Sequence, residues 1–79
     1  MSSINRIEVD SQMVREVGYT YQYLEVKYRR SWKIERFYQV PIAVYQELMD
    51  SESIGKYLNS KIKPFYKSQI INSYTQSDT

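Results

Sequence analysis

The spacing of apolar residues changes at Pro41, and this change limits the folds open to the chain. Between residues 14 and 40, apolar side chains recur at alternate positions, as in Leu24, Val26 and Tyr28, which is typical of β-strands. After Pro41 they recur at the three- and four-residue intervals of helices. The sequence therefore predicts an α+β fold, in which a small antiparallel sheet of two to three strands is followed by two helices packed on one face.

The strand region contains two signals for its internal organisation. Gly18 indicates a bend or turn between the first and second strands, and residues 29–31 indicate the hairpin tip between the second and third. Ile34 and Phe37 are separated by an odd number of positions. Both can face the core only if a β-bulge lies between them, so we expect a bulge there.

The helical region divides into two helices. Pro41 lacks an N–H, which costs nothing in the first turn of a helix, so the first helix can start there and place Tyr45 and Leu48 on one face. Ser53 is placed to cap a second helix, which Pro64 ends because proline disfavours helical geometry in the preceding residue. The apolar residues of this second helix are Ile54, Tyr57, Leu58 and Ile62.

Two residue types that often carry chemistry are absent. The 79 residues include no His and no Cys, which excludes a thiol nucleophile and argues against a metal site. No cofactor is expected, and no pair of carboxylates lies in an evidently apolar setting, so we do not expect an enzyme. No apolar run approaches the roughly 18 residues of a membrane span, and the start of the chain lacks a signal-peptide pattern. We expect a cytoplasmic protein with no membrane partner.

Several short motifs occur in an order that resembles a known family. Ser11, Val14, Val17 and Tyr19 come first, followed by Val40-Pro41, then Ser53-x-Gly-Lys-Tyr-Leu-Asn, and finally Ile62-Lys63. This order is similar to that of the KTSC domain, a short module like the one at the C-terminus of some lysyl-tRNA synthetases, which also occurs alone. Two features depart from the pattern: residues 29–31 lack the expected glycine, and the segment from there to Pro41 is about one residue longer than in the family.

The resemblance has consequences for domain organisation and function. It covers residues 11–67, which leaves residues 1–10 as a partly ordered N-terminal segment and residues 68–79 as a C-terminal tail. The resemblance implies the fold and, through the attachment to a synthetase, suggests nucleic-acid binding.

Basic and aromatic residues at the expected hairpin tip are the first candidate binding residues. Arg29, Arg30 and Lys33 surround Trp32, which combines phosphate-binding cations with a ring that can stack on a base. A solvated turn whose charges discourage edge pairing explains them as well. Nine tyrosines form the compositional outlier of the chain. Among them, Tyr21 and Tyr23 lie out of phase with the apolar residues of their strand, so they are candidates for base stacking.

The second helix supplies further candidates. If the helix stays in phase beyond Pro64, Lys56, Lys63 and Lys67 share a stripe that could follow a phosphate backbone, although an ordinary solvated face explains the stripe equally well. Ser53, Gly55 and Lys56 at the helix start could accept a phosphate. Gly55 could instead be small so that the helix can pack.

Together these features favour a nonenzymatic nucleic-acid-binding module, with RNA preferred to DNA. A small protein-interaction or inhibitor module of phage or mobile-element origin is the alternative, with the tyrosine-rich sheet face as its contact surface. A nucleotide-binding protein is the third hypothesis.

Overall fold

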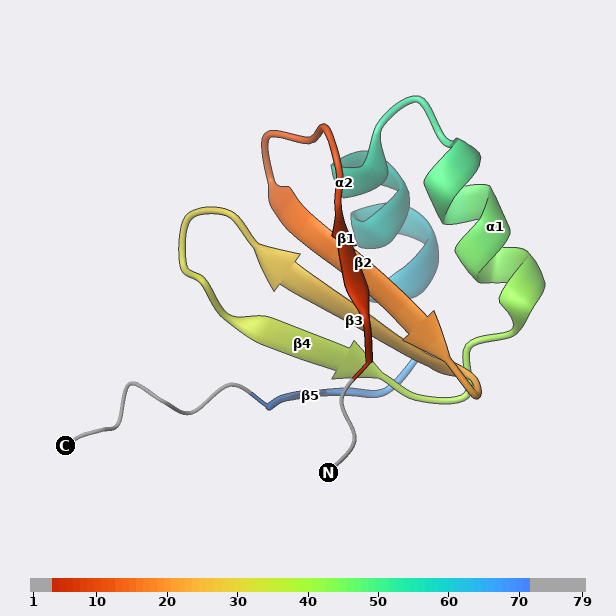
Figure 1. Cartoon of the computed structure of the whole chain (residues 1–79). Helices are drawn as coiled ribbons and strands as arrows, with labels where there is room; N and C mark the ends of the chain where they lie inside the picture. The colour runs from red at the N-terminus through yellow and green to blue at the C-terminus, as the bar shows by residue number, and fades with distance from the viewer. Residues whose placement is uncertain (1–3, 72–79) are drawn as a thin grey trace, which may run out of the picture.

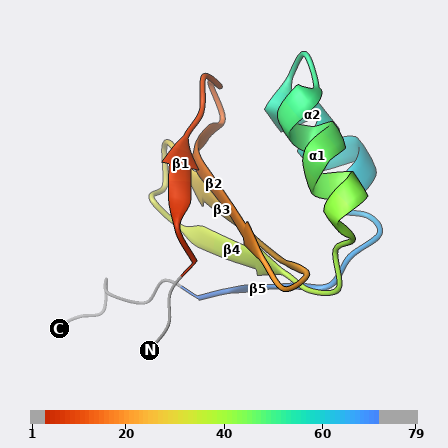
Figure 2. The same cartoon turned by 45° about the vertical axis from the view of Figure 1, so that its right-hand side comes forward.

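The computed structural model describes residues 4–71, which form a sheet and a layer of helices (Figure 1). The elements in chain order are β1 (Arg6–Glu8), β2 (Val14–Thr20), β3 (Tyr23–Tyr28), β4 (Ile34–Phe37), α1 (Ile42–Asp50), α2 (Ile54–Tyr57), the π-helical segment η1 (Leu58–Ile62) and β5 (Ser68–Ile70). All neighbouring strands are antiparallel, in the order β1-β2-β3-β4-β5. The helices lie on one face of the sheet and leave the other face uncovered, as Figure 2 shows.

The expected sheet of two to three strands is wrong, because the sheet has five. The two additional strands, β1 and β5, lie within the segments 1–10 and 68–79, and β5 follows the helices. Each has three residues, and most of their side chains are exposed. They are held by backbone pairing with β2 and β4 and by few buried side chains, so they carry no apolar alternation that sequence reasoning could detect. The remainder of the expected C-terminal tail, residues 72–79, lies outside the described residues.

The first long hairpin turns later than the sequence indicates. Gly18 lies inside β2, and the chain reverses at Tyr21 and Gln22, whose φ angles are 47° and 69°. Positive φ at both central residues is the requirement of a type I′ turn, in which Asn-Gly is the usual pair. Because tyrosine and glutamine give no turn signal, this turn was not predicted.

The β-bulge expected in β4 is found in β2, two strands away. The register between β3 and β4 is regular, with Leu24 opposite Phe37 and Lys27 opposite Ile34. Phe37 is fully buried, and Ile34 lies on the other face of the sheet. The irregularity lies in β2, between Val14 and Glu16. It brings Val14 and Val17, which are an odd number of positions apart, into the same core.

The core lies between the sheet and the helices. It is formed by fully buried apolar residues from both layers: Val14, Val17, Leu24, Val26, Phe37, Val40, Leu48, Leu58 and Ile62. The predicted Ser53 cap is confirmed, since its hydroxyl accepts a hydrogen bond from the N–H of Lys56. The π-helical segment places Leu58 and Ile62, four positions apart, in the core.

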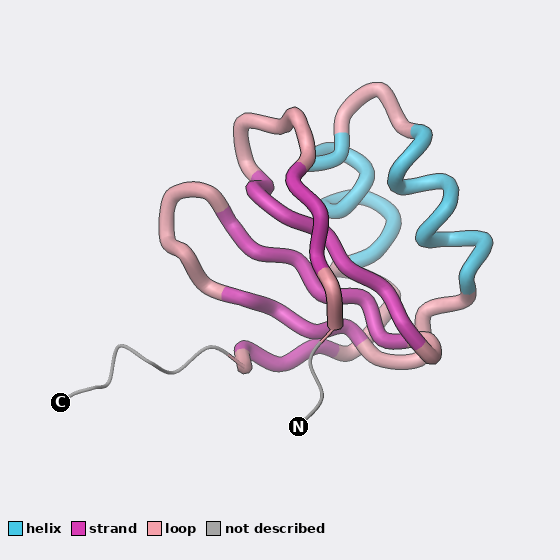
Figure 3. The backbone as a smooth tube through the Cα atoms, in the orientation of Figure 1, coloured by secondary structure: helices cyan, strands magenta, loops and turns pink. Residues whose placement is uncertain are grey.

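The loops between β1 and β2 and between β3 and β4 leave the sheet at the same end (Figure 3). They are joined there by a hydrogen bond from the N–H of Arg29 to the carbonyl of Met13.

Candidate nucleic-acid interface

A row of side chains crosses the uncovered face of the sheet from strand to strand. In this row Arg6 of β1 lies opposite Gly18 of β2, Gly18 opposite Glu25 of β3, and Glu25 opposite Arg36 of β4. Residues directly opposite each other in a sheet point to the same face. These side chains therefore lie away from the helices.

Glu25 is the centre of this row. It is only 1% exposed, and its two oxygens are bound from opposite sides: Oε1 by Arg6 Nη1 at 2.7 Å, and Oε2 by Arg36 Nε and Nη2 at 3.0 and 2.6 Å. Arg6 also donates from Nε to Glu16 Oε1 at 3.1 Å. The hydrogen bond to Glu25 raises the pKa of Arg36. A buried carboxylate is tolerated here because two guanidinium groups satisfy it.

Gly18 makes the contact between Arg6 and Glu25 possible. A Cβ atom at position 18 would lie 2.6 Å from the Asn5 carbonyl oxygen and 2.7 Å from Arg6 Cγ. The Arg6 side chain therefore occupies the space that a larger residue would fill, and it reaches over β2 to the carboxylate on β3. This is a packing requirement, since the backbone of Gly18 has an ordinary φ.

Trp32 and two cations form a cluster to one side of the row, beside the C-terminal end of β3. Arg15 Cζ lies 4.6 Å and Lys27 Nζ 4.9 Å from the centre of the indole ring. Lys27 shares the uncovered face with Glu25, because the two are two positions apart in β3. Trp32 is 43% exposed and has a φ of 62°, a conformation that bulky residues rarely adopt. The loop therefore holds an aromatic ring at a costly backbone position beside two positive charges. We call Trp32, Arg15 and Lys27 the indole cluster.

A second aromatic group lies at the other end of β3. Tyr23 is 40% exposed, with Arg36 Cζ 5.4 Å from its ring centre. Tyr38 meets the Tyr23 ring edge-on, with 5.5 Å between the centroids. We call Tyr23, Tyr38 and Arg36 the tyrosine cluster. Tyr21 lies beyond it in the turn and is 89% exposed.

The three cations of the hairpin tip, Arg29, Arg30 and Lys33, lie in different environments. Arg29 is engaged by the β1–β2 loop, since its guanidinium donates to the carbonyls of Ser11 at 2.9 Å, Val9 at 3.3 Å and Val14 at 3.5 Å. Arg30 lines a hollow with Met13 and Tyr28 on the helical side. Lys33 is exposed, and within residues 4–71 its side chain makes no hydrogen bond or ion pair. The structure therefore separates Trp32 from Arg29 and Arg30.

The three lysines of the expected stripe do not lie in one row. Lys56 lines a hollow beside the start of α2, Lys63 Nζ lies 5.2 Å from the Tyr28 ring centre, and Lys67 lies beyond the helix, beside Phe65. The π-helical segment changes the angular spacing after Tyr57, and the helix ends near Lys63. The condition for a continuous stripe, a helix in phase past Pro64, is therefore not met.

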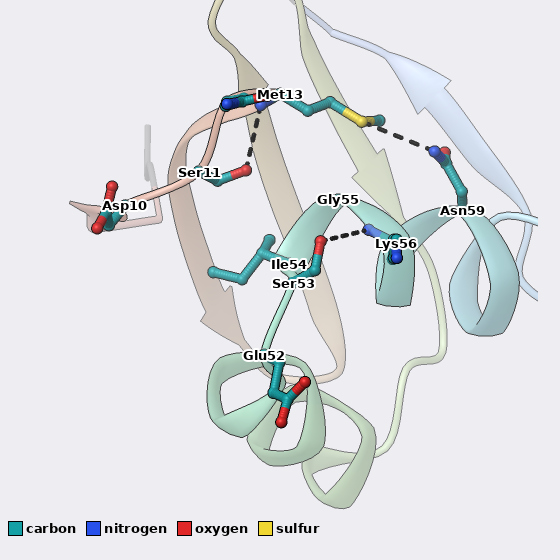
Figure 4. Close-up of a pocket in the computed structure, with 10 residues that line it drawn as sticks. Asp10, Ser11, Met13, Glu52, Ser53, Ile54, Gly55, Lys56 and Asn59 are labelled. Atoms are coloured by element: carbon teal, nitrogen blue, oxygen red, sulfur yellow. Dashed lines mark hydrogen bonds between the residues drawn. The ribbon is translucent and has the colours of Figure 1, made fainter.

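The candidate phosphate site borders a hollow of about 390 Å³ between the β1–β2 loop and α2 (Figure 4). The Ser53 hydroxyl already accepts from the N–H of Lys56, and the Ser11 hydroxyl accepts from the N–H groups of Met13 and Val14. A Cβ on Gly55 would lie 3.1 Å from Met13 Sδ. Both hydroxyls therefore accept hydrogen bonds from their own local backbone, and Gly55 permits close packing of α2 on the loop.

Two tyrosine hydroxyls bind carboxylates on the helical side. Tyr28 donates to Glu35 Oε1 at 2.6 Å, and Ser68 of β5 donates to Glu35 Oε2. Burial, with a further contribution from Glu35, raises the pKa of Tyr28. The hydrogen bond from Tyr57 to Glu47 raises the pKa of Tyr57 to about 12. Both hydroxyls are therefore held in the protonated, donating form and are poor candidates for general bases.

Sequence reasoning missed four cations of the uncovered face: Arg6, Arg15, Lys27 and Arg36. Glu25 and Lys27 alternate with Leu24 and Val26, so the period of β3 could have placed Lys27 on this face. No comparable signal exists for Arg6 or Arg15, because β1 was not predicted and Arg15 lies at the bulge.

Among residues 4–71, no three His, Cys, Asp or Glu side chains gather where they could hold a metal ion. Within the same range, no helix is long and apolar enough to cross a membrane.

These features define a small single-domain α+β protein, a five-stranded antiparallel sheet with helices on one face and a charged, aromatic row on the other. The family model of the KTSC domain matches residues 10–74, so the chain belongs to the KTSC domain family. It is similar to the crystal structure of a KTSC domain protein from Yersinia pestis, with a TM-score of 0.82 and 24% identity over 89% of this chain and 100% of that one. That likeness shows the fold alone. No curated protein matches the chain.

Proposed function

We propose that this protein is a nonenzymatic cytoplasmic module that binds single-stranded nucleic acid, RNA in preference to DNA, on the uncovered face of its sheet. The observation that supports this most is the indole cluster, a partly exposed tryptophan ring with Arg15 and Lys27 close to it. Stacking of a base on an aromatic side chain contributes ~1–3 kcal/mol in single-strand binders. Arg15 and Lys27 supply positive charge beside the ring, where it can attract the phosphates of a stacked nucleotide.

The charges of this face predict a particular kind of binding. Arg6 and Arg36 are matched by Glu16 and Glu25, and Arg15 lies 4.0 Å from the exposed Glu8. Lys27 makes no ion pair within residues 4–71. Few phosphate charges can therefore be neutralised, so stacking is expected to dominate the affinity. The logarithm of the affinity should fall only gradually with the logarithm of the salt concentration, with a slope of ~0.7 for each of one or two phosphate contacts.

A protein partner is the main competing hypothesis. Trp, Tyr and Arg are enriched at protein interfaces, so the same face suits a small interaction or inhibitor module. The nucleotide-binding hypothesis has less support, because the Ser53 hydroxyl is already bonded to the N–H of Lys56.

A fluorescence titration with single-stranded RNA tests the proposal. Trp32 is the single tryptophan, so quenching reports on this ring alone. Trp32→Asn removes the ring, and Asn tolerates the positive φ at this position, so the fold is expected to remain. We expect quenching in the native protein and an affinity loss of ~1–3 kcal/mol in the variant, measured by fluorescence anisotropy of labelled RNA.

Ile42→Ala is the matched control, because it removes an exposed apolar side chain from α1 in the helical layer. Its affinity should equal that of the native protein. Absence of binding at low salt would reject nucleic acid as the ligand and favour a protein partner. Binding that Trp32→Asn leaves intact would reject the indole cluster as the site.

A further inference from the structure

The uncovered face carries aromatic rings at two separate places. The indole cluster surrounds Lys27, and the tyrosine cluster includes Tyr23, four residues earlier in the same strand. At ~3.3 Å per residue, the two lie roughly 13 Å apart along β3. Stacked neighbours in a nucleic-acid strand are ~3.4 Å apart. Two adjacent stacked bases therefore cannot occupy both clusters.

The surface between the clusters offers hydrogen-bond donors rather than a ring. Glu25 orients Arg6 and Arg36 across the sheet. Arg6 uses Nε and Nη1, and Arg36 uses Nε and Nη2, so Arg6 Nη2 and Arg36 Nη1 make no hydrogen bond within residues 4–71. The two side chains are 21% and 29% exposed. Guanidinium groups that are held in place in this way can bind phosphate with little loss of side-chain freedom.

We propose that one nucleic-acid strand occupies both clusters at once, with separate bases on Trp32 and Tyr23 and the intervening sugar–phosphate backbone over Arg6 and Arg36. This inference rests on the proposed function and goes beyond it, since it assigns the ligand a minimum length and two stacking positions. Linking two weak contacts on one strand raises the affinity because the second contact becomes intramolecular.

The two ends of the strand are expected to differ in their response to salt. The indole cluster has Lys27 and Arg15, whereas the arginine of the tyrosine cluster is neutralised by buried Glu25. Lys27→Gln should therefore reduce both the affinity and the salt slope. Tyr23→Ala should reduce the affinity and leave the slope unchanged.

A length series of oligouridines tests the two-cluster arrangement. The series runs from a dinucleotide to roughly eight nucleotides, which falls in the ~4–16-nucleotide range of known single-strand sites. In the native protein we expect the affinity to rise steeply once the strand spans both clusters. Tyr23→Ala should remove this rise, a loss of roughly 5- to 150-fold for the longest strand, with little effect on the dinucleotide. Trp32→Asn should weaken binding at every length.

Tyr23→Phe is the matched control, because it keeps the ring and should keep the rise in affinity. Thermal unfolding of each variant verifies that it is folded. A native affinity that does not rise with length, or equal losses in Tyr23→Ala for short and long strands, would overturn the two-cluster arrangement and leave the proposed function standing. Failure of even the longest strand to bind would overturn the proposed function itself.

Discussion

Arg29 and Arg30 show how much the role of a charged residue depends on its immediate surroundings. They are adjacent in the sequence and both lie at the hairpin tip, but the Arg29 guanidinium reaches three backbone carbonyls of the β1–β2 region. Arg30 makes no hydrogen bond or ion pair within residues 4–71. Arg29 thus joins two loops, whereas Arg30 remains available to a ligand.

We therefore predict that Arg29→Gln lowers the free energy of unfolding by about 1 kcal/mol or more, because charge-assisted hydrogen bonds to the loop are lost. Arg30→Gln, the matched control, should change it by no more than ~0.5 kcal/mol. Urea denaturation of both variants measures the difference. Equal unfolding free energies for Arg29→Gln and Arg30→Gln would mean that the Arg29 contacts do not stabilise the protein in solution. Binding tests at the tip should for this reason use Arg30 and Lys33 and leave Arg29 intact.

At the scale of elements, the position of β1 depends on Gly18, the residue of β2 that is paired with Arg6. Its backbone and the Arg6 side chain lie close over Gly18, and Arg6 then joins β1 to β3 through Glu25. The strand has three residues and no fully buried side chain. Its attachment to the sheet therefore rests on backbone pairing, on the ion pairs of Arg6 and on the exposed ion pair of Glu8 with Arg15.

The two glycines of the chain give a matched prediction. Gly18→Ala places a Cβ 2.6 Å from the Asn5 carbonyl oxygen, so β1 must shift, and we expect a loss of ~1–3 kcal/mol in unfolding free energy. Gly55→Ala meets the flexible Met13 side chain at 3.1 Å. That contact should cancel the ~1 kcal/mol that alanine gains over glycine in an exposed helix, leaving little net change.

Chemical denaturation measures both glycine variants, and amide hydrogen exchange reports whether β1 is still paired. Native protection of β1 in Gly18→Ala would contradict the role assigned to Gly18. A clear gain in stability in Gly55→Ala would show that Met13 moves aside at no cost.

Across the whole molecule, Tyr28 and Glu35 connect the layers. The Tyr28 hydroxyl binds Glu35 on β4, which also accepts from Ser68 on β5, while Lys63 of the helical layer lies over the Tyr28 ring. Tyr28 of β3 is therefore linked to β4, to β5 and to the end of the helix, directly or through Glu35. Its ionisation should affect the stability of the entire fold.

Burial and Glu35 raise the pKa of Tyr28 in the folded state, so folding favours its protonated form. The corresponding stability is fully present below the unfolded tyrosine pKa of about 10 and is lost as the pH rises above that value. We predict that the free energy of unfolding declines above pH ~10, and that Tyr28→Phe makes this decline shallower while lowering stability at neutral pH. Part of the decline should remain in Tyr28→Phe, because the pKa of Tyr57 is also raised, to about 12, and its ionisation also opposes folding.

Denaturant unfolding at a series of alkaline pH values measures this decline, with Tyr21→Phe as the exposed control. If the free energy of unfolding of Tyr28→Phe falls with pH as steeply as that of the native protein, Tyr28 does not govern alkaline unfolding.

Local sequence signals were sufficient to locate β3 and the starts of the two helices. Leu24 and Val26 marked β3, the proline at position 41 marked the start of α1, and Ser53 marked the cap of α2. These signals are local, since each depends on residues within one turn or one strand. The motif order likewise identified the KTSC family, which the match over residues 10–74 confirms.

The tertiary structure alone decided the edges of the sheet and the composition of the uncovered face. Strands β1 and β5 are stabilised by backbone pairing with β2 and β4, and β4 lies far from β5 in the chain. With three mostly exposed residues each, β1 and β5 carry no apolar pattern of their own. The same pairing brings Arg6 to Glu25 across 19 positions, and the bulge in β2 and the left-handed backbone of Trp32 bring the indole to Arg15. Contacts of this kind depend on register between distant segments, which a local pattern of residues cannot specify.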